Sequence, residues 1–158
     1  MQRVIQNWKS PLEFKMPDGI FRPNGEGRQY LSYEEDQFRV EAFKSFGLLE
    51  LYTEPVFKNF VGNHYADGAA VHEHMDRAPI GYTHTRCNWM IKKPVKGGDP
   101  IINGNMLSVK EGDLWICLAS REFHSSTPIE TGERIICSFG ALIKDADIDK
   151  LNLDFYQR

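Results

Sequence analysis

Residues 100–119 have the sequence PIINGNMLSVKEGDLWICLA, in which short apolar runs alternate with turn-forming residues. The runs Pro100–Ile102, Met106–Val109 and Leu114–Ala119 have the length and composition of β-strands, and an Asn-Gly pair and a Glu-Gly-Asp triplet separate them. The same pattern begins near Pro55 and continues almost to the end of the chain. It predicts further strands at Val56–Val61, Ala69–His74, Thr83–Lys92, His124–Ile129 and Arg134–Ile143.

About eight short strands with connections of mixed length fit a mainly β fold, the double-stranded β-helix or jelly roll, which is the cupin architecture. The first thirty residues are rich in Pro and Gly and indicate irregular structure or short edge strands. After them, Ser32–Glu35 has the spacing of a helix capping box, and apolar residues recur at helical intervals up to Gly47. A weak terminal helix is expected over Asp145–Leu153. We therefore expect one domain, divided into an N-terminal segment with a supporting helix (1–54), a jelly-roll core (55–143) and a C-terminal helix and tail (144–158).

The composition is that of a soluble globular protein. The 158 residues are 41% hydrophobic and 26% charged, and no run approaches the ~20 apolar residues that a membrane span requires. The start of the chain lacks the apolar region of a secretory signal, so we expect a cytoplasmic protein. A net charge of −3 without a basic run argues against a nucleic-acid partner. Cys87, Cys117 and Cys137 are odd in number and lie in apolar runs, which predicts buried free thiols.

His74-Met-Asp76 and the distant His124 form the pattern with the clearest chemical meaning. Two histidines and a carboxylate can occupy one face of an octahedral ferrous ion and leave three positions open, which indicates catalysis rather than a structural site. A second ligand set, with His72 in place of Asp76, would suit a cupin-like metal-binding or sensory module without turnover. Cupins usually add a glutamate shortly after the second histidine, and Asp76 is the only carboxylate that directly follows here. His64 and His84 are expected to be ordinary core or surface histidines.

Arg134 follows His124 by ten residues. Its planar guanidinium is suited to holding a carboxylate through two hydrogen bonds, as a dicarboxylate cosubstrate such as 2-oxoglutarate would require.

From Tyr65 to Gly140 the sequence resembles the 2-oxoglutarate- and Fe(II)-dependent dioxygenases, particularly their prolyl-hydroxylase-like branch. The matching pieces are Tyr65-x-x-Gly68, His74-x-Asp76, Arg86 at the start of a strand, Gly97-Gly98, Glu111-Gly112-Asp113, and His124 through Gly132-x-Arg134. The resemblance implies that His74, Asp76 and His124 bind iron and that Arg134 pairs with the distal carboxylate of 2-oxoglutarate. It also places Tyr65 near the metal or the cosubstrate.

One position departs from this family pattern. Some relatives have a serine two residues after the arginine to share the carboxylate, whereas this chain has Ile136. Asn88 is a candidate for the missing partner, as are Tyr82, Thr127 and Ser138.

The activity implied by the resemblance is hydroxylation of a C–H bond with O2 and 2-oxoglutarate, which releases succinate and CO2. The substrate would be a peptidyl residue, proline among them, or a small metabolite. Nucleic-acid demethylation belongs to the same enzyme class, but the acidic charge balance counts against it.

Overall fold

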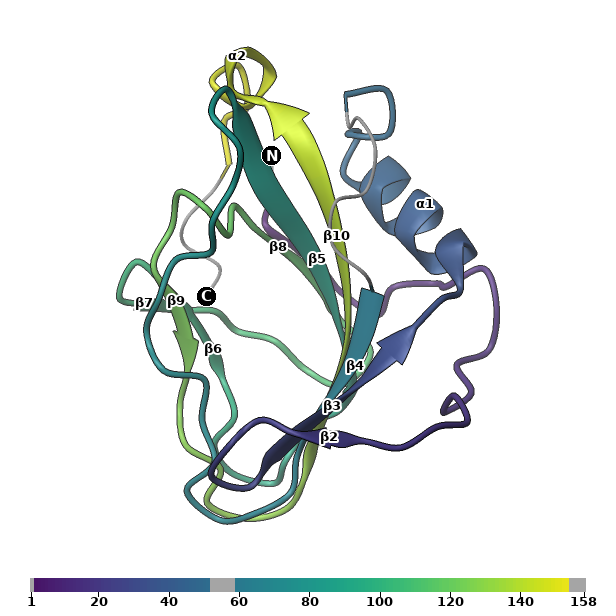
Figure 1. The fold of residues 1–158 in the computed structure, drawn as a ribbon, viewed down its shortest axis with the longest axis vertical. Helices are drawn as coiled ribbons and strands as arrows, with labels where there is room; N and C mark the ends of the chain where they lie inside the picture. The colour runs from purple at the N-terminus through teal and green to yellow at the C-terminus, as the bar shows by residue number, and fades with distance from the viewer. Residues whose placement is uncertain (1, 52–58, 154–158) are drawn as a thin grey trace.

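Two antiparallel sheets form the body of the protein (Figure 1), whose computed structural model describes residues 2–51 and 59–153. The larger sheet has seven strands in the order β1-β8-β5-β10-β4-β3-β2, and the smaller has three in the order β7-β6-β9. This is the expected double-stranded β-helix. The larger sheet contains β1 (Val4–Ile5), β2 (Arg22–Pro23), β3 (Arg28–Tyr33), β4 (Asn59–His64), β5 (Tyr82–Lys92), β8 (Leu114–Cys117) and β10 (Arg134–Lys144), and the smaller contains β6 (Pro100–Ile102), β7 (Asn105–Met106) and β9 (His124–Ser126).

The two long strands β5 and β10 separate the main apolar core from a cavity that is lined by polar and apolar side chains. Successive side chains of a strand point to opposite faces, so Trp89 and Phe139 lie on one face while Asn88 and Ser138 lie on the other. Helix α1 (Asp36–Ser45) covers the apolar face, where its Phe38 stacks on Phe139 with ring centroids 6.1 Å apart. The opposite face is thereby left to form the functional site.

Helix α1 begins later than the capping-box prediction placed it. Ser32 belongs to β3, which pairs with β4 along its whole length and keeps this segment extended. The helix is instead capped by Glu35, whose carboxylate accepts a hydrogen bond from the backbone N–H of Gln37 at 3.0 Å. The predicted end is confirmed, because Gly47 has a φ of 71° and its N–H bonds to the carbonyl of Lys44.

Several strand predictions need correction. Ala69–His74 is not a regular strand, although it runs beside residues 124–129 with hydrogen bonds from Ile129 N to Ala69 O and from Ser126 N to Val71 O. The predicted strand over Met106–Val109 is wrong, since β7 covers Asn105–Met106. Of the strand predicted at Val56–Val61, residues 56–58 lie outside the described part, and β4 extends to His64.

At the C-terminal end, α2 (Asp145–Ile148) is shorter than the helix predicted over Asp145–Leu153. Cys87, Cys117 and Cys137 are buried free thiols, as predicted. In the described part of the chain, no helix combines the length and the hydrophobicity needed to cross a membrane.

Candidate metal centre

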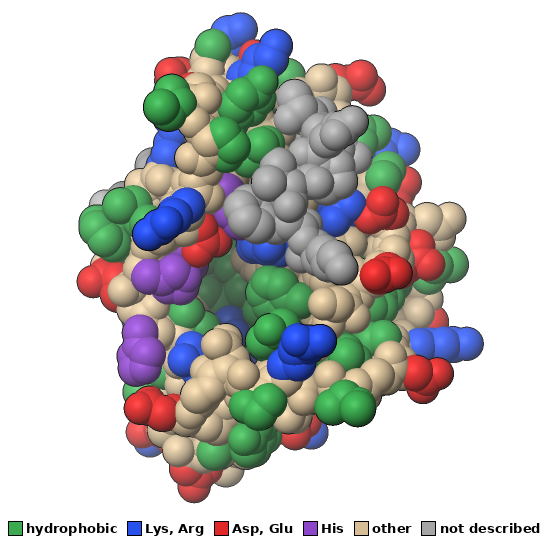
Figure 2. Space-filling view, in the orientation of Figure 1, with side chains coloured by type: hydrophobic (Ala, Val, Ile, Leu, Met, Phe, Trp, Pro, Cys, Tyr) green, Lys and Arg blue, Asp and Glu red, His purple; other side chains and the backbone are tan. Residues whose placement is uncertain are grey.

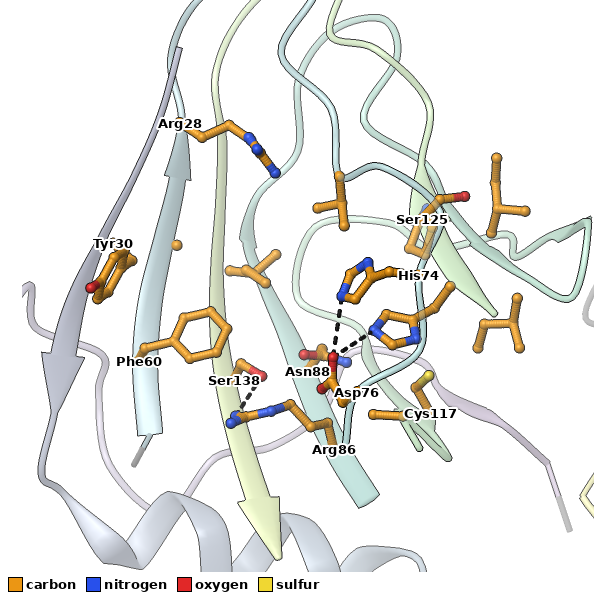
Figure 3. A pocket seen from close by; sticks show the side chains of 18 of the residues that line it. Arg28, Tyr30, Phe60, His74, Asp76, Arg86, Asn88, Cys117, Ser125 and Ser138 are labelled. Atoms are coloured by element: carbon orange, nitrogen blue, oxygen red, sulfur yellow. Dashed lines mark hydrogen bonds and ion pairs between the residues drawn. The ribbon is translucent and has the colours of Figure 1, made fainter. Parts of the chain in front are cut away.

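His74, Asp76 and His124 come together at the edge of the smaller sheet, each offering one ligand atom within 4.8 Å of the others. The Nε2 atoms of His74 and His124 lie 3.2 Å and 3.6 Å from the same carboxylate oxygen, Oδ1 of Asp76. In Figure 3 a dashed line joins the imidazole of His74 to the carboxylate of Asp76. The three residues therefore form one compact group with two nitrogen donors and one oxygen donor.

Backbone hydrogen bonds hold the three residues in place. His74 and His124 face each other in an antiparallel bridge with N–H to carbonyl distances of 3.2 Å and 3.0 Å. The N–H of Asp76 donates to the carbonyl of Ala119 at 2.8 Å, which ties the loop after His74 to the segment that follows β8. The group thus depends on the pairing of two segments fifty residues apart.

The second nitrogen of each imidazole is also fixed. Nδ1 of His74 lies 2.7 Å from the carbonyl oxygen of His72, and Nδ1 of His124 lies 3.0 Å from that of Glu122. A carbonyl oxygen only accepts, so Nδ1 carries the proton in both rings and Nε2 presents its lone pair to the shared centre. Two such imidazoles and a carboxylate fit the facial triad of a non-haem ferrous site.

The side chain of His72 lies apart from this group. It is largely exposed, and its Nε2 is 3.6 Å from Oε2 of Glu26. The structure therefore assembles the set with Asp76 and does not assemble the alternative set with His72, which contributes its backbone carbonyl instead.

His84 contacts the other oxygen of the carboxylate, with Nδ1 3.3 Å from Oδ2 of Asp76. Burial, together with the nearby Arg86 and His124, lowers the pKa of His84 to about 3, so its imidazole is neutral. The expectation that His84 is an ordinary histidine missed this contact, because no local pattern in the sequence links it to Asp76.

A cavity of about 710 Å³ adjoins the metal centre, between the two sheets. Figure 2 shows it as a hollow with hydrophobic side chains inside and histidines at its edge. On the larger sheet, the cavity face of β4 presents Phe60, Gly62 and His64, and that of β10 presents Arg134, Ile136 and Ser138. Each set alternates along its strand, as residues that share one face must.

Arg134 is 3% exposed and is held at one end of the cavity. Its Nε donates to the carbonyl oxygen of Gly98 at 3.0 Å, and its guanidinium lies 5.9 Å from the centre of the Trp115 ring. Among the described residues, its Nη1 is buried without a hydrogen-bond partner. Burial lowers the pKa of Arg134 to about 10, against the opposite influence of Asp99, so the group is charged at neutral pH. A buried charged donor without a partner is suited to an anionic ligand.

Arg28, His64 and Arg134 form a row across three strands, since His64 is the register partner of both arginines. Nε of Arg28 and Nδ1 of His64 are likewise buried without partners among the described residues. Burial and the two flanking arginines lower the pKa of His64 to about 3, which keeps its imidazole neutral and able to donate one hydrogen bond. The expectation of an ordinary histidine at position 64 overlooked this row.

The remaining two candidates differ in placement. Asn88 lines the cavity, opposite Ser138 in the β5–β10 register. Tyr65 lies just beyond the end of β4, is 52% exposed and does not line the cavity. The structure brings Asn88 to the cavity and does not bring Tyr65 there.

Comparison with known proteins shows where this fold occurs. No family model and no curated protein matches the chain. Among solved structures, the collagen prolyl hydroxylase of Paramecium bursaria Chlorella virus-1, in its 2OG complex, has a TM-score of 0.58 and 13% identity over 73% of this chain and 77% of its own. A prolyl-4-hydroxylase from Pseudomonas putida has a TM-score of 0.56 and 18% identity over 78% of this chain and 77% of its own. The cupin domain of Cnp3 from Schizosaccharomyces pombe has a TM-score of 0.52 and 12% identity over 88% and 78%. At these identities the similarity establishes a shared fold, the double-stranded β-helix.

Proposed function

We propose that this protein is an Fe(II)- and 2-oxoglutarate-dependent dioxygenase that hydroxylates a C–H bond of a peptidyl residue, proline among them, or of a small metabolite. The observation that carries the proposal is the joint presence, in one cavity, of a His-Asp-His group and a buried arginine whose Nη1 has no hydrogen-bond partner among the described residues. Neighbours of the same fold include prolyl hydroxylases, which supports this choice.

In this proposal His74, Asp76 and His124 hold the iron. The bound iron supplies the oxygen chemistry, in which one atom of O2 enters the substrate C–H bond as hydroxyl and the other enters succinate, while 2-oxoglutarate loses CO2. Arg134 holds the distal carboxylate of 2-oxoglutarate through charge-assisted hydrogen bonds. His64 lies beside Arg134 in the same row, and its neutral ring donates a hydrogen bond to that carboxylate. It thereby takes the role of the serine that some relatives have at the position of Ile136.

Two features of the protein orient and protect the reaction. Gly98 fixes the Arg134 guanidinium through its carbonyl oxygen, so that the side chain does not have to be ordered when the cosubstrate binds. Phe60 and Ile136 present apolar surface in the same cavity, which limits water next to the reacting bond.

Anaerobic titration of the Fe(II)-loaded protein with 2-oxoglutarate tests the proposal, with the weak visible charge-transfer band of the chelate as the signal. We expect a band, and succinate once oxygen is added. Asp76→Ala should lose metal binding, because two protein ligands remain. Arg134→Gln should keep the metal and bind 2-oxoglutarate at least tenfold more weakly, since a hydrogen bond to a charged group contributes about 1.5–3 kcal/mol.

Arg22→Gln is the matched control, because it removes one positive charge from an exposed position outside the cavity. Metal binding without a 2-oxoglutarate band or succinate would contradict the dioxygenase proposal and favour a binding module. An unchanged affinity for 2-oxoglutarate in Arg134→Gln would show that the cosubstrate carboxylate binds elsewhere.

A further inference from the structure

The two carboxylate oxygens of Asp76 face different neighbours. Oδ1 lies 3.2 Å from Nε2 of His74 and 3.6 Å from Nε2 of His124, the two nitrogens that present lone pairs to the metal centre. Oδ2 lies 3.3 Å from Nδ1 of His84, which belongs to β5 of the larger sheet. One oxygen therefore faces the ligand imidazoles, and the other contacts a side chain outside the ligand group.

His84 is held in this position from two sides. It is 1% exposed, its backbone N–H donates to Oγ of Ser120 at 2.9 Å, and its carbonyl accepts from the N–H of Ser120 at 3.3 Å. On the neighbouring strand β10, a Cβ atom at position 140 would lie 3.0 Å from Nε2 of His84, so Gly140 leaves the space that the ring occupies. The backbone and the far edge of the ring are thus fixed while Nδ1 faces Asp76.

The number of oxygens that Asp76 gives to a metal decides how many coordination positions remain. A ferrous ion in a facial triad has octahedral geometry, and two imidazoles with one carboxylate oxygen fill three of its six positions. A carboxylate that binds through both oxygens, as carboxylates do on larger cations, fills a fourth. In the proposed enzyme a chelating 2-oxoglutarate needs two positions, so the first arrangement leaves one position for oxygen and the second leaves none.

The contact with His84 favours the arrangement with one oxygen. A carboxylate oxygen only accepts hydrogen bonds, so the ring nitrogen that contacts Oδ2 is the one that carries the proton. Turning Oδ2 toward the metal would take the acceptor away from this buried N–H, which is unfavourable because a buried donor then lacks its partner. The imidazole of His84 therefore resists binding of the metal by both oxygens of Asp76.

We infer that His84 is a positioning residue, which holds Oδ2 of Asp76 by a hydrogen bond from Nδ1 so that Asp76 binds the metal through Oδ1 alone. Three coordination positions then stay open. This inference rests on the proposed function for the molecules that fill those positions, but the ligand geometry can be measured without them. His84 acts through Asp76 and is not itself a member of the compact ligand group.

Counting the water molecules on a bound Mn(II) ion tests the inference without turnover. The relaxation rate of water protons, measured per bound Mn(II), rises in proportion to the number of exchangeable waters on the ion. The wild-type protein should hold about three waters, and about one after saturation with 2-oxoglutarate in the absence of oxygen. About two waters without 2-oxoglutarate, or none with it, would overturn the inference, because Asp76 would then bind through both oxygens.

Two variants of matched shape separate the hydrogen bond from the packing of the ring. His84→Asn keeps an N–H at the δ position of the side chain, whereas His84→Leu has a methyl group there. The Asn variant should keep the wild-type number of waters. The Leu variant should lose about one water, which is about a third of the relaxation enhancement without 2-oxoglutarate and nearly all of it with 2-oxoglutarate. A purely structural role of the ring predicts equal numbers in the two variants, and that result in folded proteins would overturn the inference.

The two proposals fail in different ways. Three waters in the wild type, with the expected difference between the Asn and Leu variants but no displacement of water by 2-oxoglutarate, would keep the role of His84 and remove the dioxygenase. Displacement by 2-oxoglutarate that leaves one water in all three proteins would support cosubstrate binding and remove the role of His84. If His84→Leu does not fold, the number of waters on the wild-type protein still decides the inference.

Discussion

Replacing Arg3 by Met should destabilise the folded protein by about 3–5 kcal/mol, the usual cost of leaving one member of a buried ion pair without its partner. Arg3 is fully buried and Glu122 is 3% exposed. Two parallel hydrogen bonds join them, from Nη1 to Oε1 at 3.0 Å and from Nη2 to Oε2 at 2.8 Å. The carboxylate of Glu122 also accepts from the N–H of Leu118 at 2.7 Å. Without Arg3 this buried carboxylate would keep, among the described residues, the N–H of Leu118 as its side-chain hydrogen-bond partner.

A double-mutant cycle separates the pair from its surroundings. Glu122→Leu alone leaves the guanidinium of Arg3 buried and should cost a similar amount. The double variant Arg3→Met with Glu122→Leu replaces two charges by apolar side chains of comparable size, which is often close to neutral. It still loses the acceptor for Leu118 N–H, at about 1–3 kcal/mol. The double variant should therefore be more stable than the sum of the single effects predicts, by about 3 kcal/mol or more.

Urea unfolding of the four proteins without metal measures these differences, and metal titration provides the functional readout. The Arg3–Glu122 pair fixes the turn before β9, and the carbonyl of Glu122 orients the ring of His124. Metal affinity should fall by about tenfold in Arg3→Met, within the range typical for residues that orient ligands. A loss of stability below about 1 kcal/mol, or strict additivity in the cycle, would refute this reasoning.

Two further predictions concern backbone space and proton binding. Gly97→Ala should cost about 2 kcal/mol or more, because φ is +85° and the new Cβ would collide with the carbonyl oxygen of Pro128. Gly47 has a similar φ but open space around the position of a Cβ atom, so Gly47→Ala should lower the free energy of unfolding by less than Gly97→Ala in a urea titration. Equal losses for the two variants would contradict the predicted collision. His64 has a folded pKa of about 3 and an ordinary unfolded pKa near 6.5, so the unfolded state binds the additional proton between these values. Stability should therefore fall as pH decreases from about 6.5 toward 3, by up to about 1.4 kcal/mol per pH unit for this group, and His64→Gln should flatten that dependence. Urea midpoints measured from pH 7.5 to 4.5 would contradict the assignment if the wild type and the variant changed in parallel.

The strands that could be predicted from the sequence are those whose residue pattern identifies a strand without knowledge of the neighbouring strands. In β5 and β10, long runs rich in apolar and β-branched residues mark the strand whichever face is buried. Strand β3 was not predicted at its true length, because Arg28 and Tyr30 face a polar cavity while Leu31 and Tyr33 face the core. Polar residues that line a cavity are indistinguishable in sequence from residues that face solvent.

The same limit explains which site residues were found. His74 and Asp76 are two residues apart, so local spacing alone places them together, and His124 was added as the histidine near a downstream arginine. His64 has no such local signal, and Arg86 was noted only as one piece of the family resemblance, without a place in the site. Their places beside Arg134 and Ser138 follow from the pairing of β10 with β4 and β5, which is a property of register rather than of sequence spacing.

The separation of Arg134 and Ser138 along the cavity follows from the same register. The pairing of β4 with β10 runs without a break from Arg134 to Ser138, so both side chains stay on the cavity face at a distance set by the strand. The irregularity between Ile135 and Ile136 affects only the β5 side of β10. The spacing between the proposed cosubstrate anchor Arg134 and the hydroxyl of Ser138 is thus a property of the strand itself and does not depend on the loops around the cavity.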